Sequence, residues 1–192
     1  MKKIAVLFPG IGYHCDKPLL YFAGKFFKEA GYEVVQLKFS GFPINVKGNE
    51  EKMKQSFEIV KKQTMETLNI INFDAYDKIV FVSKSIGTVA AAWYEKTLNK
   101  NKQQNEKTYT HISQIYMTPL AETYKYVTSE NGIIFTGTKD PWVEHEEILR
   151  LTKEAKLDKV VIEEANHSLE TKDVLKNIEI LSEVVKKIEK YR

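Results

Sequence analysis

Cysteine is nearly absent from this sequence. Cys15 is the only cysteine among 192 residues, so no disulfide can form within the chain, and a single thiol is typical of a reducing compartment. Lys2 and Lys3 precede an apolar run over residues 4–8, but that run is too short for the core of a signal peptide. No apolar stretch approaches the ~20 residues that a membrane-spanning helix needs. We therefore expect a cytoplasmic protein with no membrane partner.

Excess charge and clustered histidines are missing as well. Lys and Arg number 29 against 26 Asp and Glu, a net charge of +3, and no basic block is interleaved with aromatic residues. We therefore expect no nucleic-acid partner. The four histidines lack the spacing of metal ligands, which predicts no metal site. Gly10-Ile11-Gly12 lacks the third glycine of a dinucleotide fingerprint, since Cys15 stands at that position, and we expect no cofactor.

The composition is that of an ordinary globular domain. Hydrophobic residues make up 43% of the chain and charged residues 29%. A chain of 192 residues can bury a sizeable core, and no internal repeat or second domain is visible. We expect residues 1–192 to form a single domain.

Strands and helices are predicted to alternate along the chain. Short apolar, β-branched runs predict strands over residues 4–8, 33–39, 79–82, 112–117, 132–136 and 159–162. Helical periodicity predicts helices over residues 19–30, 50–71, 143–153 and 172–190, and another after residue 85 that ends near residue 98. This alternation indicates an α/β fold: a three-layer α/β/α sandwich around a mostly parallel six-stranded sheet.

The remaining segments and two helix faces can also be predicted. Residues 99–108 are polar and predict a solvated loop, and residues 118–130 form a connection with some helical character. The predicted buried stripe of the helix over residues 50–71 consists of Met53, Phe57, Val60, Thr64 and Leu68. That of the last helix consists of Val174, Ile178, Leu181, Val185 and Ile188.

A serine stands at a sharp strand-to-helix turn in the middle of the chain. In Ser83-Lys84-Ser85-Ile86-Gly87 the flanking residues are small, as a strained turn requires. The stretch resembles the nucleophile elbow, G-x-S-x-G, of the α/β-hydrolases, although Ser83 replaces the first glycine. This resemblance implies that Ser85 is a nucleophile. The other interpretation is a structural turn in which Ser85 caps the following helix.

The resemblance extends to the order of the catalytic groups, which in the α/β-hydrolases is serine, acid, histidine. Here Ser85 is followed by Asp140 after the fifth strand and by His167 after the sixth. Residues 137–143 and 165–169 are similar to the acid and histidine loops of that superfamily. Glu122, after the fourth strand, is a second candidate for the acid.

The resemblance also implies an oxyanion hole and an open site. The two expected main-chain donors are the N–H groups of Ile86, after the nucleophile, and Ile11, in the loop after the first strand. The superfamily's N-terminal antiparallel strands have no counterpart before residue 4. The 118–130 connection, where larger relatives insert a cap, is short, so we expect a small, cap-less fold.

The expected function is that of a serine hydrolase cleaving a small carboxylic ester or thioester through an acyl-enzyme, with Ser85, His167 and Asp140 as its triad. Residues expected near the acyl pocket are Phe42, Leu120, Tyr124, Trp142 and Leu169. The alternative is a non-catalytic binding or interaction protein on the same scaffold, because a fold does not determine a function. The oligomeric state is left open.

Overall fold

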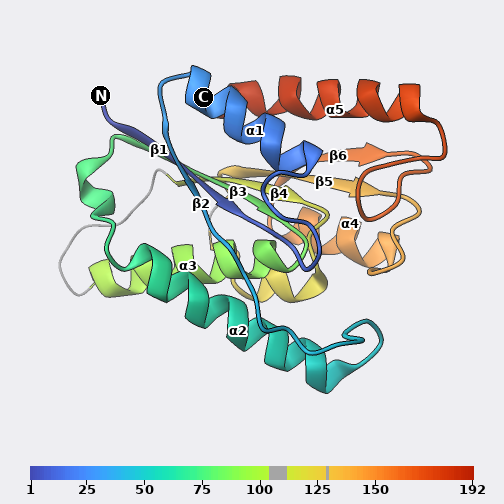
Figure 1. Cartoon of the computed structure of the whole chain (residues 1–192), viewed down its shortest axis with the longest axis horizontal. Helices are drawn as coiled ribbons and strands as arrows, with labels where there is room; N and C mark the ends of the chain where they lie inside the picture. The colour runs from blue at the N-terminus through green and yellow to red at the C-terminus, as the bar shows by residue number, and fades with distance from the viewer. Residues whose placement is uncertain (104–111, 129) are drawn as a thin grey trace.

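The computed structural model of the protein describes residues 1–103, 112–128 and 130–192. In these residues six strands form one sheet in which every neighbouring pair is parallel (Figure 1). The strands are β1 (Lys3–Phe8), β2 (Glu33–Gln36), β3 (Lys78–Lys84), β4 (Ile112–Met117), β5 (Gly132–Gly137) and β6 (Asp158–Ile162). Their order across the sheet is β2-β1-β3-β4-β5-β6. The predicted six-stranded sheet is confirmed, and all of it is parallel.

Helices cover both faces of the sheet. The α-helices are α1 (Pro18–Glu29), α2 (Glu50–Leu68), α3 (Ile86–Gln103), α4 (His145–Glu154) and α5 (Val174–Ile188). Short 3-10 turns add η1 (Phe73–Ala75), η2 (Ala121–Lys125) and η3 (Glu189–Tyr191). α1 and α5 lie on one face, whereas α2, α3 and α4 lie on the other (Figure 1). This is the predicted three-layer α/β/α sandwich. No helix in the described residues is long and apolar enough to cross a bilayer.

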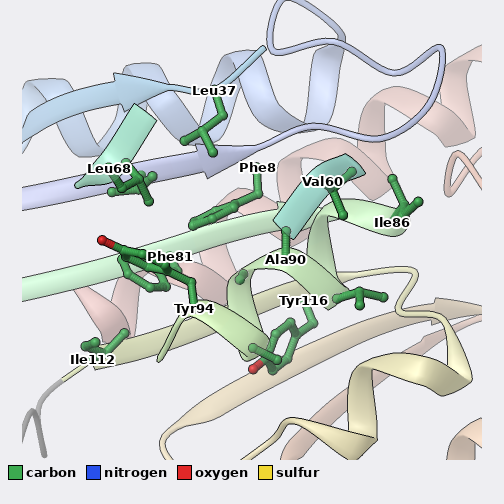
Figure 2. Close-up of a cluster of buried hydrophobic side chains, with 14 of the residues drawn as sticks. Phe8, Leu37, Val60, Leu68, Phe81, Ile86, Ala90, Tyr94, Ile112 and Tyr116 are labelled. Carbon is green, nitrogen blue, oxygen red and sulfur yellow. The ribbon is translucent and has the colours of Figure 1, made fainter. Parts of the chain in front are cut away.

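The strands bury side chains on both faces, as an enclosed parallel sheet requires. In β1, Phe8 belongs to the core beneath α2 and α3, while its neighbour Leu7 belongs to the core beneath α1 and α5. Figure 2 shows the first of these cores, where Phe8 from the sheet lies near Val60 of α2 and Ala90 of α3. The ring of Phe8 also packs against Phe81, with 5.1 Å between the centroids. The sheet thus forms a rigid base for the loops at its edge.

The carboxyl ends of all six strands lie at the same edge because the strands are parallel. The loops that follow β1, β3, β5 and β6 therefore leave the sheet from this edge. The strand order brings β1 beside β3, and β3 is separated from β5 only by β4. Ligands of open α/β sheets bind beyond the carboxyl ends of strands, so this edge is the place to look for a functional site.

Several predicted boundaries were wrong. β2, an edge strand paired only with β1, ends at Gln36 rather than at residue 39. α2 ends at Leu68 rather than at residue 71. α3 continues to Gln103, so residues 99–103 of the predicted polar loop are helical and residues 104–108 lie outside the described part. Lys and Gln are good helix formers, so a polar composition does not by itself predict a loop.

The predicted buried face of the last helix was also partly wrong. α5 begins at Val174, with the Asp173 side chain accepting from two main-chain N–H groups of its first turn. The side chains of Val174 and Ile178 are 69% and 59% exposed. The buried stripe consists of Ile180, Val184 and Ile188. At 100° per residue this stripe is rotated away from the side of the helix that carries Val174 and Ile178, so those two side chains face solvent.

Candidate active site

Ser85 lies at the apex of the turn between β3 and α3, in a strained backbone conformation. Its φ angle is +55°, in the left-handed region that residues other than glycine rarely adopt. Such a conformation costs on the order of 1–3 kcal/mol and persists only when the surroundings hold it in place. The Ser85 N–H donates to the Met117 carbonyl over 3.0 Å, and the Thr88 hydroxyl donates to the Ser85 carbonyl over 2.6 Å. The turn is thus a true elbow, held by its neighbours.

The small residues around Ser85 have identifiable packing reasons. A Cβ atom at Gly87 would overlap the main-chain carbonyl oxygen of Phe8, so only glycine fits where α3 passes β1. Ser83, which replaces the first glycine of the usual pattern, is fully buried. Its hydroxyl donates to the Ile115 carbonyl of β4 over 3.1 Å. A serine is therefore accommodated here without an unsatisfied polar group.

His167 and Asp140 complete a hydrogen-bonded chain with Ser85. The Nε2 atom of His167 lies 2.8 Å from Ser85 Oγ, and its Nδ1 atom lies 2.7 Å from Asp140 Oδ2. The second carboxylate oxygen, Asp140 Oδ1, accepts from the Trp142 N–H over 2.9 Å. The Asp140 side chain is 1% exposed and that of His167 is 15% exposed. These distances suit proton transfer from a hydroxyl to an imidazole that is oriented by a buried carboxylate.

The loops that carry Asp140 and His167 are attached to each other. At Gly137, the last residue of β5, a Cβ atom would overlap the carbonyl oxygen of Ala165, so the two loops touch at main-chain distance. The Lys139 N–H donates to that same Ala165 carbonyl over 3.0 Å. Close approach of the two main chains explains the glycine at 137 and favours the small residue two positions before the histidine.

The second candidate for the acid lies elsewhere. The Glu122 carboxylate is 2.6 Å from the Lys125 ammonium and 3.3 Å from the Tyr126 hydroxyl. Neither contact involves His167, whose Nδ1 atom bonds to Asp140. Glu122 belongs to η2, which follows β4, and its charge forms an ion pair with Lys125 of the same helical turn. Of the two candidate acids, only Asp140 bonds to His167 in the described residues.

Burial determines the protonation of His167. Removal from solvent lowers the pKa of the imidazole below its usual value, and this effect is larger than the opposing hydrogen bond to Asp140. The positive charges of Lys84 and Lys47 lower the pKa further, while the charge of Asp140 raises it. At neutral pH the imidazole is therefore uncharged, which is the state that can accept a proton.

Two main-chain N–H groups stand beside the serine with no protein acceptor. In the described part of the chain, neither the Ile11 nor the Ile86 N–H donates to another protein group. Ile86 is the first residue of α3, where a helix leaves its N–H groups unpaired. The β1 loop approaches the elbow so closely that a Cβ atom at Gly10 would lie 3.0 Å from Ser85 Cβ. Ile11 and Ile86 also line the same cavity as Ser85.

A cavity of about 220 Å³ opens at the serine. Its lining consists of Ile11, Gly12, Tyr13, Met53, Lys84, Ser85, Ile86, Leu120, Trp142, His167 and Ser168. Leu120 and Trp142 were expected there, and the Trp142 ring also lies 5.5 Å from the His167 ring. A larger cavity of about 500 Å³ lies at the opposite edge of the sheet, but its polar lining includes neither a cysteine nor a histidine.

Three residues expected near the pocket are not among those that line it. Leu169, in the loop that carries His167, is buried in the core beneath α1 and α5. Phe42 and Tyr124 pack against the core on the other face, and the Tyr124 hydroxyl shares a hydrogen bond with Thr152. Position after a strand places a residue near the edge of the sheet but does not say whether its side chain points inward or outward.

Other lining residues were not identified from the sequence. Met53 lies in α2 and was assigned only to that helix's buried stripe; its side chain is half-buried and reaches the cavity. Tyr13 and Ser168 flank residues that were identified, and that proximity was the available signal. Within the described residues no group of three or more His, Cys, Asp or Glu side chains is arranged to hold a metal ion.

Comparison with known proteins identifies the fold. No protein-family model matches the sequence, and no curated protein matches it. The structure is similar to an α/β serine hydrolase homologue from Coxiella burnetii (TM-score 0.63, 16% identity, 97% of this chain and 85% of that one). It is also similar to a Pyrococcus furiosus esterase (0.63, 12%, 98% and 83%) and to a lidless α/β serine hydrolase from Xanthomonas campestris (0.57, 12%, 98% and 81%). The chain has the α/β-hydrolase fold.

Proposed function

We propose that this protein is a serine hydrolase that cleaves a small carboxylic ester or thioester through an acyl-enzyme on Ser85. The observation that carries this proposal is the unbroken chain from Ser85 Oγ through the imidazole of His167 to the buried carboxylate of Asp140, with bonds of 2.8 and 2.7 Å. A serine hydroxyl needs such a base to become nucleophilic, and the base needs an orienting partner. The strained elbow adds support, because strain of this kind gathers at functional sites.

The proposed reaction begins with attack of Ser85 Oγ on the acyl carbon. His167 Nε2 takes the hydroxyl proton as the bond forms, and then gives it to the leaving alcohol or thiol. Asp140 holds the tautomer in which Nδ1 is protonated, and its charge stabilises the imidazolium. Water, activated by the same imidazole, then hydrolyses the acyl-enzyme and restores the free hydroxyl of Ser85. No step needs a cofactor or a metal ion.

The unpaired N–H groups of Ile11 and Ile86 are proposed to form the oxyanion hole. Negative charge develops on the carbonyl oxygen during attack, and preorganised main-chain donors are worth ~3–4 kcal/mol each in such sites. The N-terminus of α3, which begins at Ile86, adds a favourable dipole. Because the donors are main-chain groups, Pro9 in place of the histidine often found in this loop does not remove them.

The neighbours of known structure support a hydrolase at a coarse level. The Pyrococcus furiosus protein is described as an esterase, and those from Coxiella burnetii and Xanthomonas campestris as α/β serine hydrolases or homologues of them. Their identity to this chain is 10–16%, so the choice of ester or thioester rests on the chemistry of the site.

Short acyl esters are expected to be the best substrates. The cavity of about 220 Å³ is below the usual ~300–1,000 Å³ of small-molecule pockets, and in the described residues between β4 and β5 only η2 is helical. Across p-nitrophenyl esters from acetyl to palmitoyl, we expect kcat/KM to fall ~10-fold or more between butyryl and lauroyl. We expect no jump in rate when the substrate forms an interface. Preference for long chains with such a jump would show that the 12–17 loop or the 41–48 loop is a lid. Hydrolysis of none of the esters would favour the binding-protein alternative.

Hydrolysis is expected to persist into mildly acidic solution. The base must be neutral, and burial lowers the pKa of His167, so activity is lost only as the pH falls through a value below the ordinary ~6.5. The acid limb of a plot of log kcat/KM against pH should therefore have its midpoint below 6.5 and a slope of one. The measurement uses an ester that does not itself ionise in this range. A flat profile would remove His167 from the mechanism, and a midpoint above 6.5 would contradict the effect of burial.

A further inference from the structure

A lysine is fully buried immediately before the serine. Lys84 is the last residue of β3, its side chain is 1% exposed, and it also contributes to the lining of the cavity. Burial lowers the pKa of its ammonium to about 7, against the favourable charges of Asp140 and Glu170. In the described part of the chain no carboxylate forms an ion pair with it. A buried, unpaired lysine is unfavourable for stability, so a well-packed apolar side chain would serve the core better.

The ammonium of Lys84 is connected to the main chain of His167. Its Nζ atom donates to the Thr118 hydroxyl over 2.6 Å, and that hydroxyl donates to the His167 carbonyl oxygen over 3.1 Å. Nζ also lies 5.0 Å from the centroid of the Tyr13 ring, a favourable position for a cation. One hydroxyl thus joins the residue before the nucleophile to the loop that carries the base.

Thr118 is held in an unfavourable conformation to make this connection. Its φ angle is +46°, which is a clear outlier for a β-branched residue. The residue is fully buried, and its N–H donates to the Phe135 carbonyl over 2.7 Å. The strained backbone of Thr118 and the burial of Lys84 each lower the stability of the fold. Such unfavourable features persist where they position a functional group.

We propose that Lys84 is a positioning residue for the triad: through the Thr118 hydroxyl, its Nζ amino group fixes the main chain of His167 and hence the contact between His167 and Ser85. This inference rests on the proposed serine hydrolase function. Misplacement of a base by about 1 Å can lower a rate ~100-fold, so a single anchor of this kind is sufficient to matter.

The charge of Lys84 has a second, separable effect. The charged and titratable groups around it are Asp140 and Glu170, which favour its protonated form, the imidazole of His167 and the phenol of Tyr13, whose pKa is raised to about 12 by burial. Lys84 in turn lowers the pKa of His167. Removing the lysine charge should therefore raise the pKa of the imidazole. Removing only the Thr118 hydroxyl keeps that charge and should leave the pKa of the imidazole unchanged.

The test compares Lys84→Met, Thr118→Val and Thr118→Ser by the second-order rate of labelling with a fluorophosphonate, measured against pH. We expect the first two variants to react ~10- to 100-fold more slowly than the wild type at pH 8, and Thr118→Ser to restore most of the rate because it keeps the hydroxyl. The double variant Lys84→Met/Thr118→Val should be no slower than the slower single variant, because both substitutions interrupt the same path of hydrogen bonds from Lys84 through Thr118 to His167. Lys84→Met should also move the acid limb to higher pH, and Thr118→Val should not.

Thermal unfolding separates positioning from general damage. The unfolding midpoint of Lys84→Met should stay at or above the wild-type value, because methionine replaces a buried charge. Lys61→Met is a matched control: Lys61 is another shielded lysine, 13% exposed and bonded to Tyr126, but it does not line the cavity, and its labelling rate should not change.

Two results would overturn the inference while leaving the proposed function intact: wild-type labelling rates in Lys84→Met, or rates in the two single variants that multiply in the double variant. If Lys84→Met fails to fold, equal rates in Thr118→Val and Thr118→Ser would overturn it as well. A wild-type protein that does not react with the fluorophosphonate would instead overturn the proposed function itself.

Discussion

Replacing Ser85 with alanine is expected to abolish ester hydrolysis, with a loss in kcat on the order of a million-fold. The reason is that no other hydroxyl bonds to His167 Nε2 in the described residues, so no second nucleophile can use the same base. Alanine fits the elbow, because within the residues that the structure describes the Ser85 side chain makes no hydrogen bond other than that to His167. The unfolding midpoint should therefore remain close to that of the wild type.

The measurement is steady-state hydrolysis of a short ester by wild type and Ser85→Ala, together with fluorophosphonate labelling followed by peptide mass spectrometry. Ser113→Ala is a suitable control, because Ser113 lies in β4 toward the opposite edge of the sheet, where its hydroxyl accepts from Asn131. Its activity should equal that of the wild type. Substantial hydrolysis by a clean Ser85→Ala preparation would show that the elbow serine is structural.

Replacing Asp140 with asparagine is expected to lower kcat by about four orders of magnitude. Asparagine keeps the shape of the side chain and can still accept from the Trp142 N–H through its oxygen. Its amide group facing His167 Nδ1 would favour the wrong tautomer, and the negative charge that stabilises the imidazolium would be gone. The loss should appear in kcat and in the labelling rate, with little change in the unfolding midpoint.

Glu122→Gln is the matched control, since it makes the same change at the other acidic candidate. Its contacts with Lys125 and Tyr126 are on the surface of η2, so activity should change less than ~3-fold. If Glu122→Gln were the inactive variant and Asp140→Asn the active one, the acid would be Glu122, and the observed bond between Asp140 and His167 would have no catalytic meaning.

Local sequence was sufficient for the elements that depend on local rules. The buried strand β3 could be predicted from its β-branched run, and the elbow from the spacing of small residues around Ser85, because a sharp strand-to-helix turn excludes larger side chains on steric grounds. Gly87 is required by contact with the carbonyl of Phe8, and only a glycine meets that requirement.

Residues whose role depends on distant contacts could not be placed in this way. Ser83 looked like a departure from the elbow pattern, but a carbonyl of β4 accepts its hydroxyl. Met53 lines the cavity from α2, more than 30 residues before Ser85 in the sequence. Leu169, only two residues after His167, is instead buried in the core. Which stripe of α5 faces the core likewise depends on how the whole helix packs: Ile180, Val184 and Ile188 are buried, whereas Val174 and Ile178 are exposed.

The sequence by itself determined the alternation of strands and helices, the parallel sheet and the order of Ser85, Asp140 and His167 at the ends of three strands. The first two follow from hydrophobic periodicity and from the rule that parallel strands end at one edge, whereas the three residues and their order were identified from the resemblance to the α/β-hydrolases. Only the tertiary structure placed His167 beside Asp140 and away from Glu122, gave the cavity its size, and joined Lys84 to His167 through Thr118. Each of these depends on distances between side chains far apart in the chain, which are set by the packing of whole strands and helices against one another.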